Sequence, residues 1–407
     1  MLFVKLAWRN LFRNKRRTIL AGTAIGIGLA SLIVVDALML GTETNMIHSA
    51  TGSFMGQGQI HGENYRATLE REYVITDPTT VLTELQQDST VAHFTPRAMS
   101  FAMISSPANV VAGTMIGVVP QTERHLSQFD EALIEGEYFQ GDSRYDLLIG
   151  YKLAELLEVA LGDRVVITVA KAHTGELSQE MFRISGIYNF NTEELDRAMA
   201  IVRLPVAQNM LGLEGQAHEI AVTIVKDGIE NAPAHEFRAR YSTAGNEALG
   251  WRELMPQFSN VLEMTGLSTL IIGVVLFALV ALGIINTLFM SLYERMFEFG
   301  VMRAVGTRPF GIGRVVAYEA AALAVVSILF GALLGWFVTY ILLQYGIDYS
   351  GIEFAGVTFR ERLYPELELR QFTLFPVLVF VFTVVVGLYP AGYAARMNAA
   401  EAMRRSF

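Results

Sequence analysis

Four long apolar stretches, separated by polar segments of very different lengths, set the pattern of this 407-residue chain. A helix needs about 20 apolar residues to cross the hydrocarbon core of a bilayer. Each stretch reaches that length, and the second and fourth carry no charged residue. The pattern therefore predicts four transmembrane helices, at 18–42, 265–292, 315–345 and 372–393.

The long segment between the first two stretches, 43–264, follows a different pattern. Short alternating or β-branched runs predict strands at 101–104, 110–119, 164–171, 181–188 and 219–225. Patches with apolar residues at helical spacing predict short helices at 79–87, 151–158, 207–211 and 234–240. Strands mixed with short helices are typical of an α+β domain. The domain could form two lobes, and no Gly/Ser or Pro linker marks where the boundary between them would lie.

The distribution of charge predicts which segments face the cytoplasm, because Lys and Arg accumulate in cytoplasmic loops. The segment 1–17, the loop 293–314 and the region after the fourth stretch together hold thirteen basic and three acidic residues, whereas 41–266 holds fifteen basic and thirty acidic residues. We therefore expect both termini and 293–314 in the cytoplasm and 43–264 outside. The segment 346–371 would be a short outer loop and 394–407 a cytoplasmic tail.

Composition and motifs argue against a catalytic, metal-binding or phosphate-binding site in this chain. Apolar residues make up 52% and charged residues 17%, which favours a membrane protein. The lack of cysteine excludes disulfides, thiolate metal sites and a cysteine nucleophile, and a net charge of −9 argues against nucleic acid. The zinc-protease motif, the G-x-S-x-G elbow and the phosphate-binding P-loop are all missing from the sequence. We expect a protein that is not an enzyme, with no catalytic residue, metal site or cofactor of its own.

Small residues in the apolar stretches predict close helix packing. Gly22 and Gly26 are four residues apart, and so are Gly331 and Gly335. This spacing lets helix backbones approach closely in lipid. The glycines serve either a dimer interface or packing within one chain. Asp36 lies about one turn from the outer end of its stretch, where snorkelling or a local partner explains it better than a proton relay.

The polar segment between the second and third stretches reads ERMFEFGVMRAVGTRPF, residues 294–310. Its apolar residues Phe297, Val301, Ala304 and Val305 fall on one helical stripe, and its charged residues fall on another face. Gly300 within the helix suggests close approach by another backbone, and Gly306 followed by Pro309 predicts the helix end. Such a helix at the cytoplasmic face either lies on lipid headgroups or docks a cytoplasmic protein.

The motif E-R-x-x-E-F-G-x-x-R-A-x-G in this segment resembles the coupling segment of ABC-transporter permeases of the FtsX, MacB and LolC/LolE family. Residues 8–11, WRNL, resemble the amphipathic elbow helix of that family, here 1–17. Residues 388–391, LYPA, and 399–404, AAEAMR, resemble its C-terminal signature, and 186–196 resembles a stretch of the MacB-type periplasmic domain. The order of one span, a large outer domain and three spans is also that of the family.

The resemblance implies a function and a set of partners. The chain would be a permease in the bacterial inner membrane, with its large domain in the periplasm. ATP and Mg would be bound by a separate cytoplasmic ABC ATPase, because this chain begins at the elbow and lacks a P-loop. A second permease copy or paralogue and membrane lipids would complete the assembly. The residues that couple to the ATPase would be Glu294, Arg295, Glu298, Gly300, Arg303, Ala304 and Gly306.

Within this family the large outer domain favours export of a lipoprotein or another amphiphile from the membrane. An FtsX-like signalling subunit and a MacB-like efflux component are the alternatives. The loop between the strands at 164–171 and 181–188 is our candidate for contact with a periplasmic acceptor or partner protein. Its residues are His173, Thr174, Gly175 and Glu176.

Overall fold

The computed structural model describes residues 9, 15–139, 143–190, 192–224, 232–243, 245–348, 353–354, 357–358 and 362–396. Most of the expected elbow at 1–17 and the end of the tail, 397–407, lie outside these residues and stay predictions. The chain divides into two compact units. The membrane unit contains the residues up to Asn45, Glu263–Asp348 and the residues from Arg362 onward, and the α/β unit contains Met46–Leu262 and Tyr349–Glu361.

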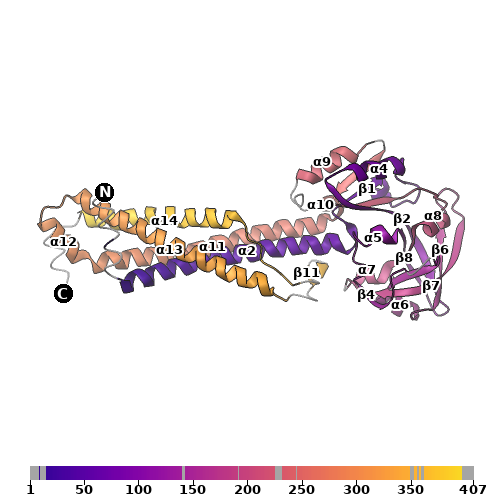
Figure 1. The fold of residues 1–407 in the computed structure, drawn as a ribbon, viewed down its shortest axis with the longest axis horizontal. Coiled ribbons are helices and arrows are strands. Elements are labelled where there is room, and N and C mark those ends of the chain that lie inside the picture. The colour runs from indigo at the N-terminus through magenta and orange to yellow at the C-terminus, as the bar shows by residue number, and fades with distance from the viewer. Residues whose placement is uncertain are drawn as a thin grey trace. The chain divides into compact units, whose positions relative to one another are not determined.

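Four long helices build the membrane unit (Figure 1): α2 (Lys15–Ala50), α11 (Pro256–Glu294), α13 (Pro309–Tyr345) and α14 (Leu369–Arg396). Each is long and apolar enough to cross a bilayer, and together with the α/β unit they confirm the expected fold class. At about 1.5 Å per residue, the 39 residues of α11 extend for roughly 58 Å, well beyond a hydrocarbon core of about 30 Å. The last turn of α2 and the first turns of α11 belong to the α/β unit.

The glycines in the membrane unit pack α2 against α13 within one chain. A Cβ atom on Gly331 would lie 2.6 Å from the carbonyl oxygen of Gly26, and one on Gly335 would lie 3.2 Å from the Cβ of Ile33. Gly22 lies beside Ser327 of α13. Since lipid provides no hydrophobic drive for helix association, this close approach of backbones is what van der Waals packing requires.

The first lobe of the α/β unit is a small antiparallel sheet in the order β10–β1–β9–β2. Its strands are β1 (Gly58–Gly62), β9 (Glu219–Ile224), β10 (Asn246–Gly250) and the first half of β2 (Val91–Ser105). The helices α4 (Pro78–Gln87) and α9 (Ala232–Tyr241) pack on it through a buried core that includes Leu85 and Phe237. The first lobe thus has its own hydrophobic core between the sheet and these two helices.

The second lobe is a larger mixed sheet that begins at the second half of β2. From β2 the order continues β3–β8–β5–β7–β4, with β6 paired to β2 and β7. These strands are β3 (Val110–Val118), β4 (Leu133–Gly136), β5 (Asp146–Gly150), β6 (Arg164–Ala170), β7 (Leu177–Tyr188) and β8 (Met199–Arg203). The pairs β3–β8 and β5–β7 are parallel. The helices α6 (Tyr151–Leu157) and α8 (Leu204–Leu211) contribute buried leucines to its core.

Short elements connect these layers. They are η1 (Thr51–Met55), α3 (Tyr65–Thr68), α5 (Pro120–Glu123), α7 (Glu193–Ala198), α10 (Trp251–Leu254), β11 (Glu353–Phe354) and β12 (Val357–Thr358). Of these, η1 is a single turn of π-helix that directly follows α2.

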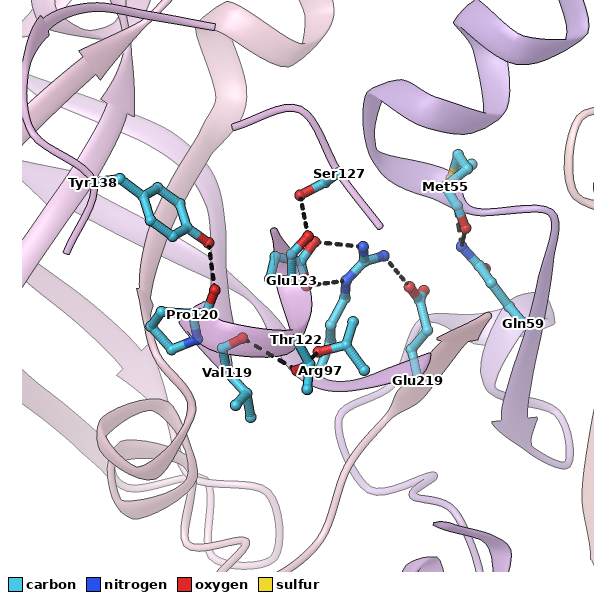
Figure 2. Close-up of polar contacts among 11 residues, drawn as sticks. Met55, Gln59, Arg97, Val119, Pro120, Thr122, Glu123, Ser127, Tyr138 and Glu219 are labelled. Atoms are coloured by element: carbon cyan, nitrogen blue, oxygen red, sulfur yellow. Dashed lines mark hydrogen bonds and ion pairs between the residues drawn. The ribbon is translucent and has the colours of Figure 1, made fainter. Parts of the chain in front are cut away.

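A buried charged network lies where the two lobes share β2 (Figure 2). Arg97 of β2 lies opposite Glu219 of β9 in the strand register, and its Nη1 donates to Glu219 Oε1 at 2.7 Å. Its Nε and Nη2 donate to the two carboxylate oxygens of Glu123 on α5, at 3.0 and 2.6 Å. The ring centroid of Phe54 from η1 lies 4.0 Å from the guanidinium carbon. All three charged side chains are buried, so each depends on its partners for charge compensation.

Candidate functional site

The polar segment between α11 and α13 folds as the short helix α12 (Met296–Ala304), with Arg295 at its N-cap. The helix α11 ends at Glu294, and α13 begins at Pro309, whose fixed φ suits the first helical turn. Helix α12 lies at one end of the membrane unit (Figure 1). It is therefore joined by short connections to two membrane helices.

Arg295 ties α12 to α13. Its Nε donates to Glu298 Oε2 at 2.9 Å, within α12, and its Nη1 donates to Glu319 of α13. The guanidinium carbon also lies 5.2 Å from the ring centroid of Phe299. Arg295 is 6% exposed and Glu319 is 8% exposed. Because separating a buried ion pair leaves a charge without its partner, this contact fixes the position of α12 on α13.

Apolar packing holds the same face of α12. Phe299 belongs to a buried cluster with Leu292 of α11, Ile312 of α13 and Ala394 of α14. Gly300, the next residue, is also buried. Three membrane helices thus converge on this face, so that a displacement of α12 is transmitted to all of them through packed side chains.

The opposite face of α12 presents apolar residues to the surroundings. Phe297, Val301, Ala304 and Val305 are all exposed, and Val305 is 82% exposed. We call these four residues the exposed stripe. A contiguous apolar surface of this kind marks a site for a protein partner or for the membrane surface, which are the two interpretations that the sequence left open.

The end of α12 has the hydrogen bonds of a Schellman motif. The Thr307 N–H donates to the Met302 carbonyl at 3.0 Å, and the Gly306 N–H donates to the Arg303 carbonyl at 3.0 Å. Gly306 has a φ of +97°, a conformation that glycine adopts without steric cost. The helix therefore stops where the sequence predicted, and Pro309 starts the next one.

The seven coupling residues expected from the resemblance occupy three environments. Glu294, Ala304 and Gly306 are exposed, Glu298 and Arg303 are partly buried, and Arg295 and Gly300 are buried. In this structure Arg295 holds the helix through Glu298 and Glu319, and Gly300 lies on the buried face. Glu294, Ala304 and Gly306 lie at the surface. Whether these residues couple to an ATPase stays a prediction.

Glu319 is the residue of this site that the sequence reasoning missed. In the sequence it is a charge near the start of the third apolar stretch, and nothing nearby indicates its partner. A single acid in a long apolar helix, 24 residues after the arginine that it binds, is a weak signal. Glu319 predicts an ion pair only if charged residues within membrane helices are expected to pair with one another.

The second candidate segment, 173–176, forms the tip of the hairpin between β6 and β7. His173, Thr174, Gly175 and Glu176 are all exposed, and Gly175 has a φ of +69°. Lys171 pairs with Glu176 across the turn at 3.3 Å. The hairpin is accessible, and its contact with a partner protein stays a prediction.

The described part of the chain contains no group of three or more His, Cys, Asp or Glu side chains arranged to hold a metal ion. The geometry of α12 joins a surface helix to membrane helices through one ion pair and one apolar cluster. The other face of α12, with the exposed stripe, remains accessible to a partner protein or to the membrane surface.

Comparisons with known proteins agree with this architecture. The family described as MacB-like periplasmic core domain matches residues 18–236, and the family described as FtsX-like permease C-terminal matches residues 270–399. The lipoprotein-releasing system transmembrane protein LolC of Xylella fastidiosa is 22% identical, over 78% of each chain. LolC of Neisseria meningitidis is 21% identical, over 99% of this chain and 100% of the relative.

Among solved structures, the periplasmic region of MacB from Actinobacillus actinomycetemcomitans matches 52% of this chain and 96% of its own, at 13% identity and a TM-score of 0.36.

The two family matches lie on the α/β unit with its preceding helix and on the three later membrane helices. Together with the four membrane helices, they establish that this chain belongs to the FtsX, MacB and LolC/LolE family of ABC-transporter permeases.

Proposed function

We propose that this permease uses ATP hydrolysis by a cytoplasmic ABC ATPase to release a lipoprotein or another amphiphile from the inner membrane. One observation carries the proposal: α12 is fixed to α13 by Arg295 and Glu319 on one face and leaves an apolar stripe exposed on the other. A helix held in this way is suited to receive a push from a partner and pass it on. The names of the LolC relatives, which refer to lipoprotein release, support the substrate class.

The transmission path follows from the connections of α12. The ATPase, which we propose is a separate polypeptide that binds ATP and Mg, would hold the exposed stripe in a groove. A movement of the ATPase would displace α12. The ion pair of Arg295 with Glu319 would pass this displacement to α13, and the short connection after Glu294 would pass it to α11. Because the first turns of α11 belong to the α/β unit, a shift of α11 would also reach that unit. Each step requires two discrete arrangements with different affinity for ATP.

Assembly and orientation are part of the proposal. The excess of Lys and Arg in 1–17, in 293–314 and after the fourth span supports cytoplasmic termini and a cytoplasmic α12. The α/β unit would then lie in the periplasm, as the name of the matched family suggests. A second permease, either a copy or a paralogue, would provide the other half of the transporter, and the hairpin at 173–176 would meet a periplasmic acceptor.

Reconstitution tests the proposal directly. The chain and its copurified ATPase are placed in vesicles that contain a fluorescent triacylated lipoprotein, and a soluble lipid-binding acceptor is added outside. We expect ATP, but not a non-hydrolysable analogue, to transfer the lipoprotein to the acceptor. ATP hydrolysis at full rate without transfer of any amphiphile would contradict export. Activation of a periplasmic hydrolase under the same conditions would favour the signalling alternative.

A further inference from the structure

A cleft in the α/β unit shares no residue with α12 or its contacts. It measures about 390 Å³, which is within the range of small-molecule sites. Four methionines contribute to its lining: Met55, Met99, Met199 and Met255. Methionine side chains are flexible and polarizable, so they adapt to irregular apolar ligands. The cleft thus has the size and the lining of a site for an apolar group.

The lining of the cleft also includes large apolar side chains that are exposed in this structure. Phe101 of β2 is 69% exposed and Leu69 is 46% exposed, and both line the cleft. Exposed apolar surface that is concave and surrounded by polar residues marks binding sites in soluble domains. A ligand that covered these two side chains would remove that surface from water.

The backbone around the cleft is unusual at two places. The π-helix η1, which contributes Phe54 and Met55 to the lining, is a rare element found frequently at functional sites. Leu69, at the end of α3, has a φ of +53°, a conformation that costs a non-glycine residue free energy and is kept where the surroundings require it. Phe54, Met55 and Leu69, which line the cleft, thus lie at these two deviations.

Electrostatics distinguishes the two charged residues of the lining. Glu219 is compensated by Arg97, which donates to it at 2.7 Å. Arg66 donates from Nη2 to the Leu254 carbonyl at 3.0 Å and forms no ion pair within the described part of the chain. It is partly exposed. Arg66 is therefore the cation available to an anionic group in the cleft.

The connections between the α/β unit and the membrane helices lead to the same cleft. Ala50, the last residue of α2, lines it, and so does Met255, which directly precedes α11. A movement of α11 in the proposed transmission path would thus act on the lining at Met255. We propose that this cleft binds the alkyl chain of an anionic amphiphile, with Arg66 contacting the acidic headgroup. The inference rests on the proposed function and extends it to a substrate site on the α/β unit.

Photolabelling tests the cleft in the full-length chain. The chain is placed in phosphatidylcholine nanodiscs with hexadecanoic acid that carries a diazirine in its alkyl chain, and labelled residues are mapped by mass spectrometry. We expect label on 53–69, 99–101, 192–199 and 255. Met99→Trp fills the cleft and should lower this label at least about fivefold, the change expected when apolar contacts are lost. Label confined to the membrane helices would overturn the proposal.

Matched variants check the specificity of the site. Met103→Trp changes an exposed methionine of the same strand that lies outside the lining. The amount of label should stay within about twofold of that in the unmodified chain, which corresponds to a change in binding free energy smaller than RT. Met199→Trp, from a different strand, repeats the test if Met99→Trp does not fold. Equal loss of label in Met103→Trp and Met99→Trp would overturn the assignment of the cleft.

The headgroup contact has its own test. Arg66→Gln should lower labelling by the acid about fivefold or more, because a charge-assisted bond is lost, while labelling by the matching diazirine hexadecanol stays unchanged. Arg66→Lys should keep most of the preference for the acid. Equal labelling by acid and alcohol in the unmodified chain would overturn the role of Arg66.

The fate of the cleft and the fate of the proposed function are distinguishable. Labelling requires no ATP, whereas lipoprotein transfer does. Cleft label that responds to Met99→Trp, in a chain that transfers no lipoprotein, would support the cleft and refute export. Transfer at the normal rate in Met99→Trp, with no label in the cleft of the unmodified chain, would refute the cleft and leave export standing.

Discussion

Single residues determine where α12 ends, and Gly306 offers the most direct test. Its φ of +97° is unfavourable for any residue with a Cβ atom, although no neighbour lies within 4 Å of that position. Gly306→Ala should therefore destabilise the helix end by about 1–2 kcal/mol through backbone strain alone. Hydrogen exchange of the amides at 302–307 measures this, and we expect faster exchange in the variant.

A matched alanine substitution separates backbone strain from a general effect of added volume. At Gly273 of α11 an added Cβ atom would also have no neighbour within 4 Å, and this glycine has no positive φ. Gly273→Ala should leave exchange at 302–307 unchanged. Equal protection of these amides in Gly306→Ala and in the unmodified chain would contradict the assigned role of Gly306.

His218 in the α/β unit predicts a dependence of stability on pH. The Met99 N–H donates to its Nδ1 at 3.0 Å, so its Nε2 carries the proton and donates to the Arg71 carbonyl at 2.9 Å. Burial lowers the pKa of His218, and this outweighs the opposite effects of the Arg71 carbonyl and Glu219. The folded protein thus favours neutral His218, and its stabilising effect is complete above the ordinary pKa of about 6.5.

As the pH falls below that value, the unfolded chain binds a proton that folded His218 resists, so stability decreases. The decrease is at most about 1.4 kcal/mol per pH unit for one proton. Thermal unfolding of the α/β unit in the full chain, measured from pH 8 to pH 5, should show this slope. His218→Gln should flatten it, and His173→Gln, at the exposed hairpin, should not. An unchanged slope in His218→Gln would refute the assignment.

Glu219 should not contribute in the same pH range. Burial raises the pKa of its carboxyl, but the contacts with His61 and Arg97 outweigh burial and hold the pKa below its ordinary value. Its stabilising effect is therefore complete above the ordinary carboxyl pKa of about 4.3 and is lost only as the pH falls below it. The two neighbouring residues thus act in separate pH windows.

Between elements, the ion pair of Arg295 and Glu319 governs how firmly α12 is held on α13. Glu319→Gln should lower stability by about 3–5 kcal/mol, because it leaves the buried guanidinium without one of its two carboxylates. The double variant Arg295→Met with Glu319→Leu should lose less than the sum of the single changes, since no charge remains unpaired. Thermal unfolding in detergent measures all three.

The exposed pair of Lys152 and Glu155 on α6 is the control for this cycle. It is a close contact, 2.6 Å, but its side chains are 35% and 65% exposed. Glu155→Gln should therefore cost less than about 1 kcal/mol. If Glu319→Gln costs no more than Glu155→Gln, the buried pair does not anchor α12.

Elements with a strong local pattern were predicted from the sequence, and elements defined by distant partners were not. The strands expected at 110–119, 164–171 and 219–225 occur as β3, β6 and β9, because their alternation is local. The strands β1 and β10 were missed. Both are short and contain glycine, and they are stabilised by pairing with each other across almost 190 residues of sequence. The candidate site shows the same difference. The helical spacing of apolar residues predicted α12, whereas Glu319, the partner of Arg295, lies on another helix and was not predicted.

At the scale of the whole molecule, the coupling that we propose requires α12 both to pack on the membrane helices and to contact the ATPase. Substitutions on the exposed stripe and on the buried face of α12 should therefore impair different steps. Gly300→Leu places a large side chain on the buried face, so we expect it to displace α12 from the membrane helices. The ATPase should still bind and hydrolyse ATP, but the lipoprotein transferred per ATP should fall by about tenfold or more, as when a well-packed contact is lost.

Val305→Asp should instead weaken the binding of the ATPase itself. An exposed valine that becomes buried against a partner contributes about 1.5 kcal/mol or more, and a carboxylate in its place adds a cost of desolvation. We expect at least about a tenfold loss of ATPase affinity, measured by titration in nanodiscs. Val110→Asp, at a valine of the α/β unit that is 58% exposed, should leave this affinity unchanged. Normal affinity in Val305→Asp would contradict docking of the proposed ATPase on the exposed stripe and would favour contact of the stripe with lipid, the other interpretation of this helix.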